Sequence, residues 1–294
     1  MTFNFKSLVL SGCGPKCIGF MGCLHQLQEN KIVDILNINT FIGVSSGSML
    51  SYLLILGYTP HEILQNLVKD KVFNHLFATM NFSNILNGHG IFNYDIINNY
   101  IRKLTYDKTG KHTITFKDIR EIYNKRLVIC SYNETHCRTV YFDSANMKYD
   151  DIACLVAIRC SSNIPYVFSD FYYKDCEYID GGISDILPIH IADNKLDEVL
   201  ALVTNLYTST ITDSNQNNIL KKLINRIQIP IKINLQRRIE YSSPKVKLID
   251  IPMLNYPIYD FDLDTSKMID MFNIGMEYAN NAPEQWKKTH SKLD

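Results

Sequence analysis

A serine between two glycines is the first feature of this sequence that could do chemistry. Gly43, Ser45 and Gly47 form a G-x-S-x-G pattern between a short apolar run, 40–44, and a longer apolar run that ends at Gly57. In a nucleophile elbow the serine sits at the tip of a sharp strand-to-helix turn, and small neighbours let the chain reverse. The alternative is a loop whose serines only cap a helix. The flanking strand and helix favour the elbow, so Ser45 is the candidate nucleophile.

Asp180 is the candidate base for this serine. It ends an apolar strand and precedes Gly181 and Gly182. An aspartate before two glycines is often only a turn former. A nucleophilic serine needs a base, however, and a carboxylate at the end of a sheet strand is well placed to serve as one.

Two histidines offer an alternative base. His190 follows Asp180 by ten residues and could complete a Ser-Asp-His order. It lies in an apolar stretch, 187–191, which favours a packed structural imidazole instead. His89, between two glycines, is interpreted as a loop residue.

A glycine-rich turn follows the first predicted strand, 7–10. Gly12, Cys13 and Gly14 come directly before a predicted helix, so free backbone N–H groups and a helix N-terminus would face any anion bound there. A dinucleotide pyrophosphate fits poorly, because the spacing to Gly19 is wrong and no acidic residue closes the next strand. The oxyanion formed when Ser45 attacks an ester fits better.

The elements that must position these groups alternate between strands and helices. Consecutive parallel strands with a right-handed crossover would bring the glycine-rich turn and the elbow to one edge of the sheet. The other predicted strands are 126–131, 139–142, 198–203 and 246–251, and the predicted helices are 60–70, 95–103, 118–124, 152–159, 220–227 and 267–280.

Three connecting segments have no regular pattern. The aromatic and Asn-rich segment 71–93 is either a lid or substrate-facing region, or ordinary packing beneath a long connection. Segment 159–165 is predicted as a turn, and 208–218 as a polar loop.

Composition excludes several functional classes. Thirty basic residues balance thirty acidic ones, so no overall field favours nucleic acid, and the pairs Lys221–Lys222 and Arg237–Arg238 are interpreted as solvated faces. The eight cysteines include no C-x-x-C pair, which argues against zinc. With no signal-peptide pattern and no apolar run of about 20 residues, we expect reduced thiols and a cytoplasmic or peripheral-membrane protein.

The glycine-rich turn, the elbow and the Asp-Gly-Gly resemble the motifs of the patatin-like phospholipase family of lipid acyl hydrolases. The resemblance extends over 7–205 and is weak over 206–294. Its four blocks, in the order of the family, are 12–17, 43–47, 157–165 and 180–182.

This resemblance implies a three-layer α/β/α sandwich with a mostly parallel central sheet. Residues 7–205 would form the patatin-like core, and 206–294 would be a C-terminal extension packed on the same domain. No cofactor or metal is implied, and the expected partner is a lipid or membrane surface.

The resemblance also implies a mechanism without histidine, in which Ser45 attacks the acyl carbonyl and Asp180 takes its proton. The backbone N–H groups of Gly12, Cys13 and Gly14 would hold the oxyanion. The motif positions around these groups are Lys16, Gly43, Gly47, Gly181 and Gly182.

Three positions depart from the family pattern. Cys13 and Cys17 stand where glycine is usual, and a Cβ at Cys13 would be costly if the turn needed a positive φ there. Asp185 stands where asparagine is frequent, and the sequence assigns it no role. The predicted activity is that of a phospholipase A or lysophospholipase, and the alternatives are acyl transfer by the same two residues and an inactive lipid-binding module.

Overall fold

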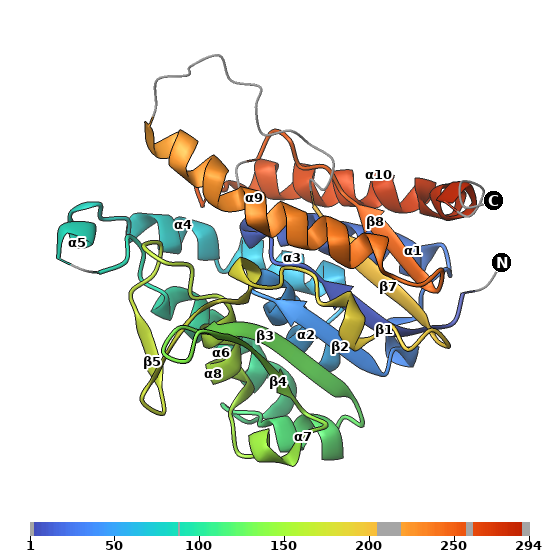
Figure 1. The fold of residues 1–294 in the computed structure, drawn as a ribbon, viewed down its shortest axis with the longest axis horizontal. Coiled ribbons are helices and arrows are strands. Elements are labelled where there is room, and N and C mark those ends of the chain that lie inside the picture. The colour runs from blue at the N-terminus through green and yellow to red at the C-terminus, as the bar shows by residue number, and fades with distance from the viewer. Residues whose placement is uncertain (1–2, 88, 205–218, 257–260, 290–294) are drawn as a thin grey trace.

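A mixed sheet of eight strands forms the centre of the molecule (Figure 1). The computed structural model describes residues 3–87, 89–204, 219–256 and 261–289. The strand order is β5-β6-β3-β2-β1-β7-β8, and β4 also pairs with β3. The strands are β1 (Phe5–Leu10), β2 (Thr40–Val44), β3 (Arg126–Asn133), β4 (Arg138–Asp143), β5 (Phe171–Tyr173), β6 (Cys176–Asp180), β7 (Glu198–Val203) and β8 (Val246–Asp250).

Helices flank this sheet, as expected for an α/β fold. They are α1 (Cys17–Glu29), α2 (Ser46–Ile55), α3 (Pro60–Lys69), α4 (Val72–Ala78), α5 (Ser83–Leu86), α6 (Asp95–Thr109), α7 (Phe116–Glu121), α8 (Cys154–Ser161), α9 (Ile219–Glu240) and α10 (Thr265–Thr289). The short 3-10 helices used below are η1 (Gly14–Lys16), η4 (Gly181–Ile183) and η5 (Ile189–Ile191).

The central strands are apolar on both faces, so their side chains divide between two cores. In β1, Leu8 and Leu10 enter a large cluster with α1, α2 and α10, whereas Val9 enters a smaller cluster on the opposite face. That smaller cluster is covered by 186–192 and by Leu235 of α9.

The predicted parallel pair is confirmed. β1 and β2 run parallel, with Leu10 opposite Gly43, and α1 forms the crossover between them. The glycine-rich turn after Leu10 and the elbow after Val44 therefore leave the sheet at the same edge.

A second convergence brings the end of β6 to the end of β2. Val44 pairs with Cys130 in a parallel register, and Asp180 pairs with the next residue, Ser131, in an antiparallel register. Because β4 occupies the other edge of β3 over this stretch, β2 and β6 share one edge and meet end to end. Ser45 and Asp180 are thus brought together by β3.

Several predicted element bounds were wrong. The short helix at 118–124 begins earlier, because the side chain of Thr115 caps it. The predicted turn at 159 is still helical, since α8 continues to Ser161. The predicted helix 220–227 is the start of α9, which continues past Pro230 to Glu240.

Segment 71–93 contains the two short helices α4 and α5, and the predicted loop 208–218 lies outside the described residues. Toward the C-terminus, β8 extends the sheet beside β7, and α10 packs on α1. Glycines permit this packing, because a Cβ at Gly22 would lie 1.9 Å from the Phe272 carbonyl oxygen and one at Gly275 would lie 2.0 Å from that of Gly19.

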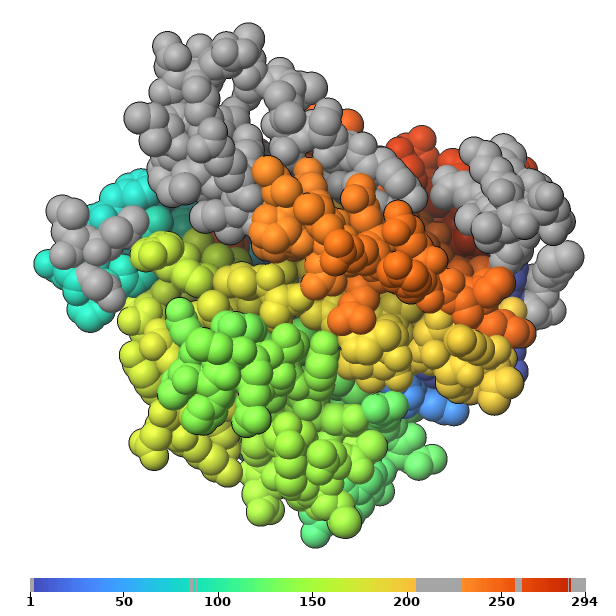
Figure 2. Space-filling model, viewed as in Figure 1, coloured from blue at the N-terminus to red at the C-terminus, as the bar shows by residue number. Residues whose placement is uncertain are grey.

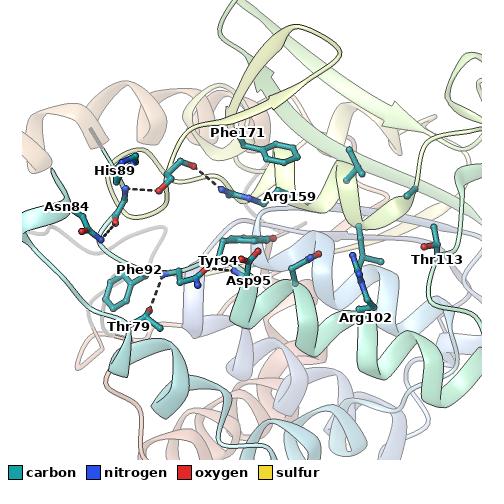
Figure 3. A pocket seen from close by; sticks show the side chains of 17 residues that line it. Thr79, Asn84, His89, Phe92, Tyr94, Asp95, Arg102, Thr113, Arg159 and Phe171 are labelled. Carbon is teal, nitrogen blue, oxygen red and sulfur yellow. Dashed lines mark hydrogen bonds between the residues drawn. The ribbon is translucent and has the colours of Figure 1, made fainter. Parts of the chain in front are cut away.

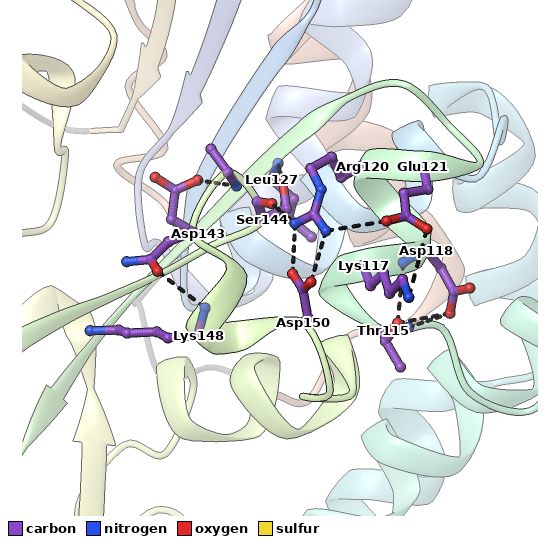
Figure 4. Close-up of polar contacts among 12 residues, drawn as sticks. Thr115, Lys117, Asp118, Arg120, Glu121, Leu127, Asp143, Ser144, Lys148 and Asp150 are labelled. Atoms are coloured by element: carbon purple, nitrogen blue, oxygen red, sulfur yellow. Dashed lines mark hydrogen bonds and ion pairs between the residues drawn. The ribbon is translucent and has the colours of Figure 1, made fainter.

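Polar contacts fasten the outer edge of the sheet at β4 (Figure 4). The Arg120 guanidinium of α7 donates to both carboxylate oxygens of Asp150 at 2.6 and 2.8 Å. Arg126 of β3 makes the same two-point contact with Asp143 of β4 at 3.0 and 2.7 Å. These contacts lie away from Ser45 and Asp180 in the sheet, so we assign them to the scaffold.

Candidate active site

Ser45 occupies a strained elbow. Its φ of 52° and ψ of −123° are rare for a residue with a Cβ, and strain of this kind is typical of a nucleophile elbow. The Ser45 N–H donates to the Ser161 hydroxyl at 2.8 Å, and the Ser48 hydroxyl donates to the Ser45 carbonyl at 2.6 Å. These contacts hold the turn between β2 and α2.

The elbow depends on close backbone contacts. A Cβ at Gly43 would lie 2.4 Å from the Ser48 Cα, and a Cβ at Gly47 would lie 2.4 Å from the Leu10 carbonyl oxygen. A Cβ at Gly12 would come within 3.2 Å of the Ser45 Cβ. Glycine at these positions therefore lets β1, β2 and α2 approach the serine together.

Asp180 is a buried carboxylate at the end of β6. It is 7% exposed, and burial raises its pKa to about 6, while hydrogen bonding by the Ser45 side chain and the Gly182 N–H acts in the opposite direction. The Gly182 N–H donates to Asp180 Oδ1 at 2.7 Å and so orients the carboxyl group. A group with this pKa is ionised at neutral pH and can still accept a proton, as general-base catalysis requires.

The glycine-rich turn accommodates a Cβ at Cys13. The φ of Cys13 is −151°, and the positive φ of 57° falls on Gly14, where it carries little cost. The Cys13 N–H donates over a long 3.3 Å to the Ser46 hydroxyl, and among the described residues the Gly14 N–H has no acceptor. The Gly12 N–H donates to the Ile186 carbonyl, also at 3.3 Å.

Both thiols of this turn are protonated at neutral pH, with Cys13 buried and Cys17 partly exposed. Burial raises the pKa of Cys13 well above its usual value and that of Cys17 to about 12, so neither is a thiolate at neutral pH. Lys16 is 6% exposed, and burial lowers its pKa. The turn thus places the N-terminus of α1 beside the elbow, since Cys17 and Ser45 line the same cavity.

A narrow apolar cavity of about 100 Å³ opens beside Ser45. Its walls come from α1, α2, α3, α4 and α6, and include Leu53, Leu67, Phe73, Ile101 and Phe168. Phe73 shows that part of 71–93 faces this cavity. Such a slot suits an acyl chain, because nearly all of its wall is aliphatic or aromatic.

A larger cavity of about 650 Å³ is lined by Tyr94, Arg159 and Phe171, among others (Figure 3). Neither Ser45 nor Asp180 lines it. The Arg159 guanidinium sits 4.0 Å above the Tyr94 ring and donates to Asn163 and to the Ser169 carbonyl. We assign Arg159 to the wall of this larger cavity, not to catalysis.

The histidines lie away from the nucleophile. His89 is an exposed loop residue at the larger cavity, as predicted. The prediction of a packed imidazole at His190 was wrong, because its side chain is 41% exposed. His190 Nδ1 lies 3.7 Å from Asp185 rather than beside Asp180.

Sequence reasoning missed several groups that shape the site. Ser161, which receives the Ser45 N–H, lies in the segment expected to be a turn. Arg238 was interpreted as solvated, but it pairs with Asp185. These contacts join residues far apart in the chain, so no local pattern could have shown them.

The described residues hold neither a metal-binding cluster nor a membrane-spanning helix. They contain no group of three histidine, cysteine or acidic side chains placed to hold a metal ion. Their helices are each too short or too polar to cross a bilayer.

Comparison with known proteins places this geometry in a family. The sequence profile described as patatin-like phospholipase matches residues 8–193, which include the turn, the elbow and Asp180. The chain belongs to the patatin-like phospholipase family.

Viral proteins are among its relatives. The "Probable lipid hydrolase 463L" of Invertebrate iridescent virus 6 is 29% identical over an alignment that covers 96% of this chain and 90% of that protein. The uncharacterized protein R571 of Acanthamoeba polyphaga mimivirus is 28% identical over 73% of this chain and 68% of its own length.

A solved structure shows the same fold. VipD from Legionella pneumophila is 16% identical, with a TM-score of 0.51, and the match covers 95% of this chain and 67% of that one. Patatin-like members thus share the central sheet and its flanking helices with this chain.

Proposed function

We propose that this protein is a serine lipid acyl hydrolase that cleaves fatty-acyl esters of phospholipids or lysophospholipids. Family membership and the similarity to a protein named as a lipid hydrolase support the reaction class. The observation that carries the proposal is the meeting of the Ser45 elbow with the buried carboxylate of Asp180 on one edge of β3.

In the proposed reaction the Ser45 hydroxyl attacks the ester carbonyl carbon while its proton passes to the Asp180 carboxylate. The carbonyl electron pair moves to oxygen, and the tetrahedral intermediate collapses to an acyl-serine as the alcohol leaves with the proton from Asp180. Water then attacks the acyl-serine, again giving its proton to Asp180, and the fatty acid departs as Asp180 returns that proton to the Ser45 oxygen.

Two N–H groups are the proposed oxyanion donors. We retain Cys13 and Gly14 from the predicted set and exclude Gly12, because its N–H is already bonded to the Ile186 carbonyl. The Cys13 N–H bonds instead to a side-chain hydroxyl, which can rotate away and free the N–H for an oxyanion, an acceptor of charge-assisted hydrogen bonds.

The acyl chain would occupy the apolar cavity. Leu50 and Leu53 of α2 line this cavity within three turns of Ser45, so a chain bound there ends beside the nucleophile. The N-terminus of α1 would favour the negative charge that develops on the ester oxygen.

Product analysis tests the proposal. Purified protein is incubated with mixed phospholipid vesicles, and free fatty acid, lysolipid and any new acyl ester are quantified by mass spectrometry. We expect fatty acid release by wild type and a loss of ~10³-fold or more in Ser45→Ala, as in other activated-serine enzymes. Acyl transfer to another lipid would indicate a transacylase, and equal traces in both proteins would indicate a binding module.

A further inference from the structure

Several hydrogen bonds from other parts of the fold hold the loop that follows Asp180. Asp185, five residues after Asp180, is 2% exposed. Its Oδ2 accepts from the Tyr141 hydroxyl at 2.8 Å and from the Arg238 guanidinium at 2.9 Å. A buried carboxylate needs such partners, since desolvating an unpaired charge costs several kcal/mol.

Helix α9 supplies two of these hydrogen bonds. Asn234 and Arg238 are one turn apart on α9, and the Asn234 side chain donates to the Ser184 carbonyl at 2.8 Å. Two successive loop residues are therefore held by two successive turns of one helix. Figure 2 shows α9 (orange) lying over the segment that follows Asp180 (yellow).

The same loop reaches the other catalytic groups. Its Ile186 carbonyl accepts the Gly12 N–H of the glycine-rich turn, and its Gly182 N–H orients the Asp180 carboxylate. The Cys130 thiol of β3 donates to the Asp185 carbonyl at 3.6 Å. A displacement of 184–186 would thus disturb both the base and the oxyanion turn.

We propose that Arg238 and Asp185 form a positioning pair, through which α9 holds the Asp180 loop in its reactive geometry. The inference rests on the proposed function, and it adds a part that lies outside the family-matched residues 8–193. Neither residue touches the reacting atoms, so both act through Asp180 and the glycine-rich turn.

The pair explains the departure of Asp185 from the asparagine frequent in the family. A neutral amide could accept the Tyr141 hydroxyl, but it would not attract a guanidinium. With aspartate, this chain can recruit Arg238 across the sheet face. Asp185 Oδ1 and Arg238 Nε, which have no hydrogen-bond partner among the described residues, are the two atoms that a two-point pairing would join.

Four variants of the full chain test the pair. Arg238→Ala removes the cation, Arg238→Lys keeps the charge without the planar fork, and Asp185→Asn keeps the shape without the charge. Arg237→Ala, an exposed arginine next to Arg238 on the same helix, is the matched control. Activity is measured on a water-soluble short-chain ester, so that lipid binding does not enter.

We expect Arg238→Ala to lower kcat by about 10- to 100-fold with KM within twofold, because misplaced catalytic groups cost up to ~10²-fold. Arg238→Lys should recover at least a third of the wild-type kcat, and Asp185→Asn should lose about tenfold. Arg237→Ala should stay within twofold of wild type.

The pH profile separates positioning from lost stability. Asp185 and Arg238 are absent from the groups that shift the pKa of Asp180, so a direct charge effect is not expected. If the loop moves and the Gly182 bond is lost, the acid limb of kcat/KM moves to higher pH in Arg238→Ala. A variant that only unfolds more easily would keep the wild-type limb.

Equal kcat and equal acid limbs in Arg238→Ala and Arg237→Ala would overturn the positioning pair while leaving the hydrolase proposal intact. If Arg238→Ala does not fold, Arg238→Lys and Asp185→Asn decide, and wild-type kcat in both would overturn the pair. A wild type that cleaves no ester, neither soluble nor lipid, would instead contradict the proposed function.

Discussion

The two faces of the sheet differ in the size of the core that covers them and in what they contribute to the site. We call the face with the larger core the thick face and the face with the smaller core the thin face. One face carries the large core with α1, α2, α3, α6, α8 and α10, and it holds the apolar cavity beside Ser45. The other face is covered by 186–192 and α9, with Leu235 as the buried residue that α9 contributes. The first face has the larger hydrophobic core, whereas the second combines a smaller hydrophobic cluster with the polar contacts of Asp185.

This difference suggests that the two faces have separate roles in the proposed reaction. Under the proposed function, side chains on the thick face would set which acyl chain is accepted, since they line the apolar cavity. Contacts on the thin face hold the loop that presents Asp180, and they do not reach the acyl chain. Substitutions on the thick face should therefore change chain-length preference, and substitutions on the thin face should change turnover for every chain.

The largest effect is expected at Asp180, the proposed base at the end of β6. Asp180→Asn keeps the shape of the side chain and removes the base, so we expect a loss of ~10³-fold or more in kcat/KM. Steady-state kinetics on a soluble ester checks this, with Asp170→Asn, an exposed loop aspartate, as the control. A variant that keeps a tenth of the wild-type activity would remove Asp180 from the mechanism.

The same variant should be more stable than wild type at alkaline pH. The pKa of Asp180, about 6, lies above the ~3.9 of an unperturbed aspartate, so the folded state binds this proton more tightly than the unfolded state does. The free energy of unfolding therefore falls as pH rises from about 4 past 6, by at most ~3 kcal/mol.

Urea unfolding of both proteins at pH 4 and pH 8 measures this contribution. The stability gained by Asp180→Asn over wild type should be larger at pH 8 than at pH 4. A gain that is the same at both pH values would show that the pKa of Asp180 is not raised.

A smaller effect is expected from narrowing the slot on the thick face. Leu67 of α3 lines the cavity, and Leu67→Phe adds bulk there. Each methylene that loses its buried site costs about 0.8 kcal/mol, or roughly fourfold in kcat/KM. We expect kcat/KM to fall about tenfold more for a long-chain ester than for a short-chain ester.

Ile122→Phe, at an exposed position, is the control for the slot. Arg238→Ala supplies the contrast between the faces, since it should lower activity equally for both chain lengths. If Arg238→Ala no longer discriminated between chain lengths, this result would contradict the proposed difference in role between the two faces.

The smallest effects are expected at the histidines. His190→Ala and His89→Ala should each retain kcat/KM within a few-fold of wild type, because neither imidazole lies beside Ser45. His190 contacts Asp185 from the solvent side of the thin face, and burial together with Arg238 lowers its pKa. A loss of ~10³-fold in His190→Ala would replace the dyad with a Ser-His-Asp mechanism.

Local patterns predicted the elbow, the glycine-rich turn and the Asp-Gly-Gly, because each is a contiguous turn with a fixed need for small residues. They also predicted that Cys13 would be tolerated only with a negative φ, and the observed φ is −151°. The parallel pairing of β1 and β2 followed from their strand-helix-strand order.

Other parts could not be predicted in this way. The approach of β6 to the end of β2 depends on register along β3, and the hairpin of β5 and β6 has too few residues for a clear pattern. The predicted helix 220–227 was too short, because α9 continues through Pro230, a residue that usually ends or kinks a helix, to Glu240. The Asp185–Arg238 pair joins the loop after Asp180 to α9, 53 residues further along the chain. No rule of sequence spacing describes such a contact.

The rate at which a fluorophosphonate labels Ser45, followed by mass spectrometry against pH, tests the dyad most directly. We expect one adduct, on Ser45 and not on Ser46 or Ser48. The labelling rate should rise with pH through a midpoint near pH 6, the pKa of Asp180. Asp180→Asn should abolish labelling, and His190→Ala should leave both the rate and the midpoint unchanged. Labelling of Ser46 or Ser48, or loss of the Ser45 adduct in His190→Ala, would contradict a Ser45–Asp180 dyad.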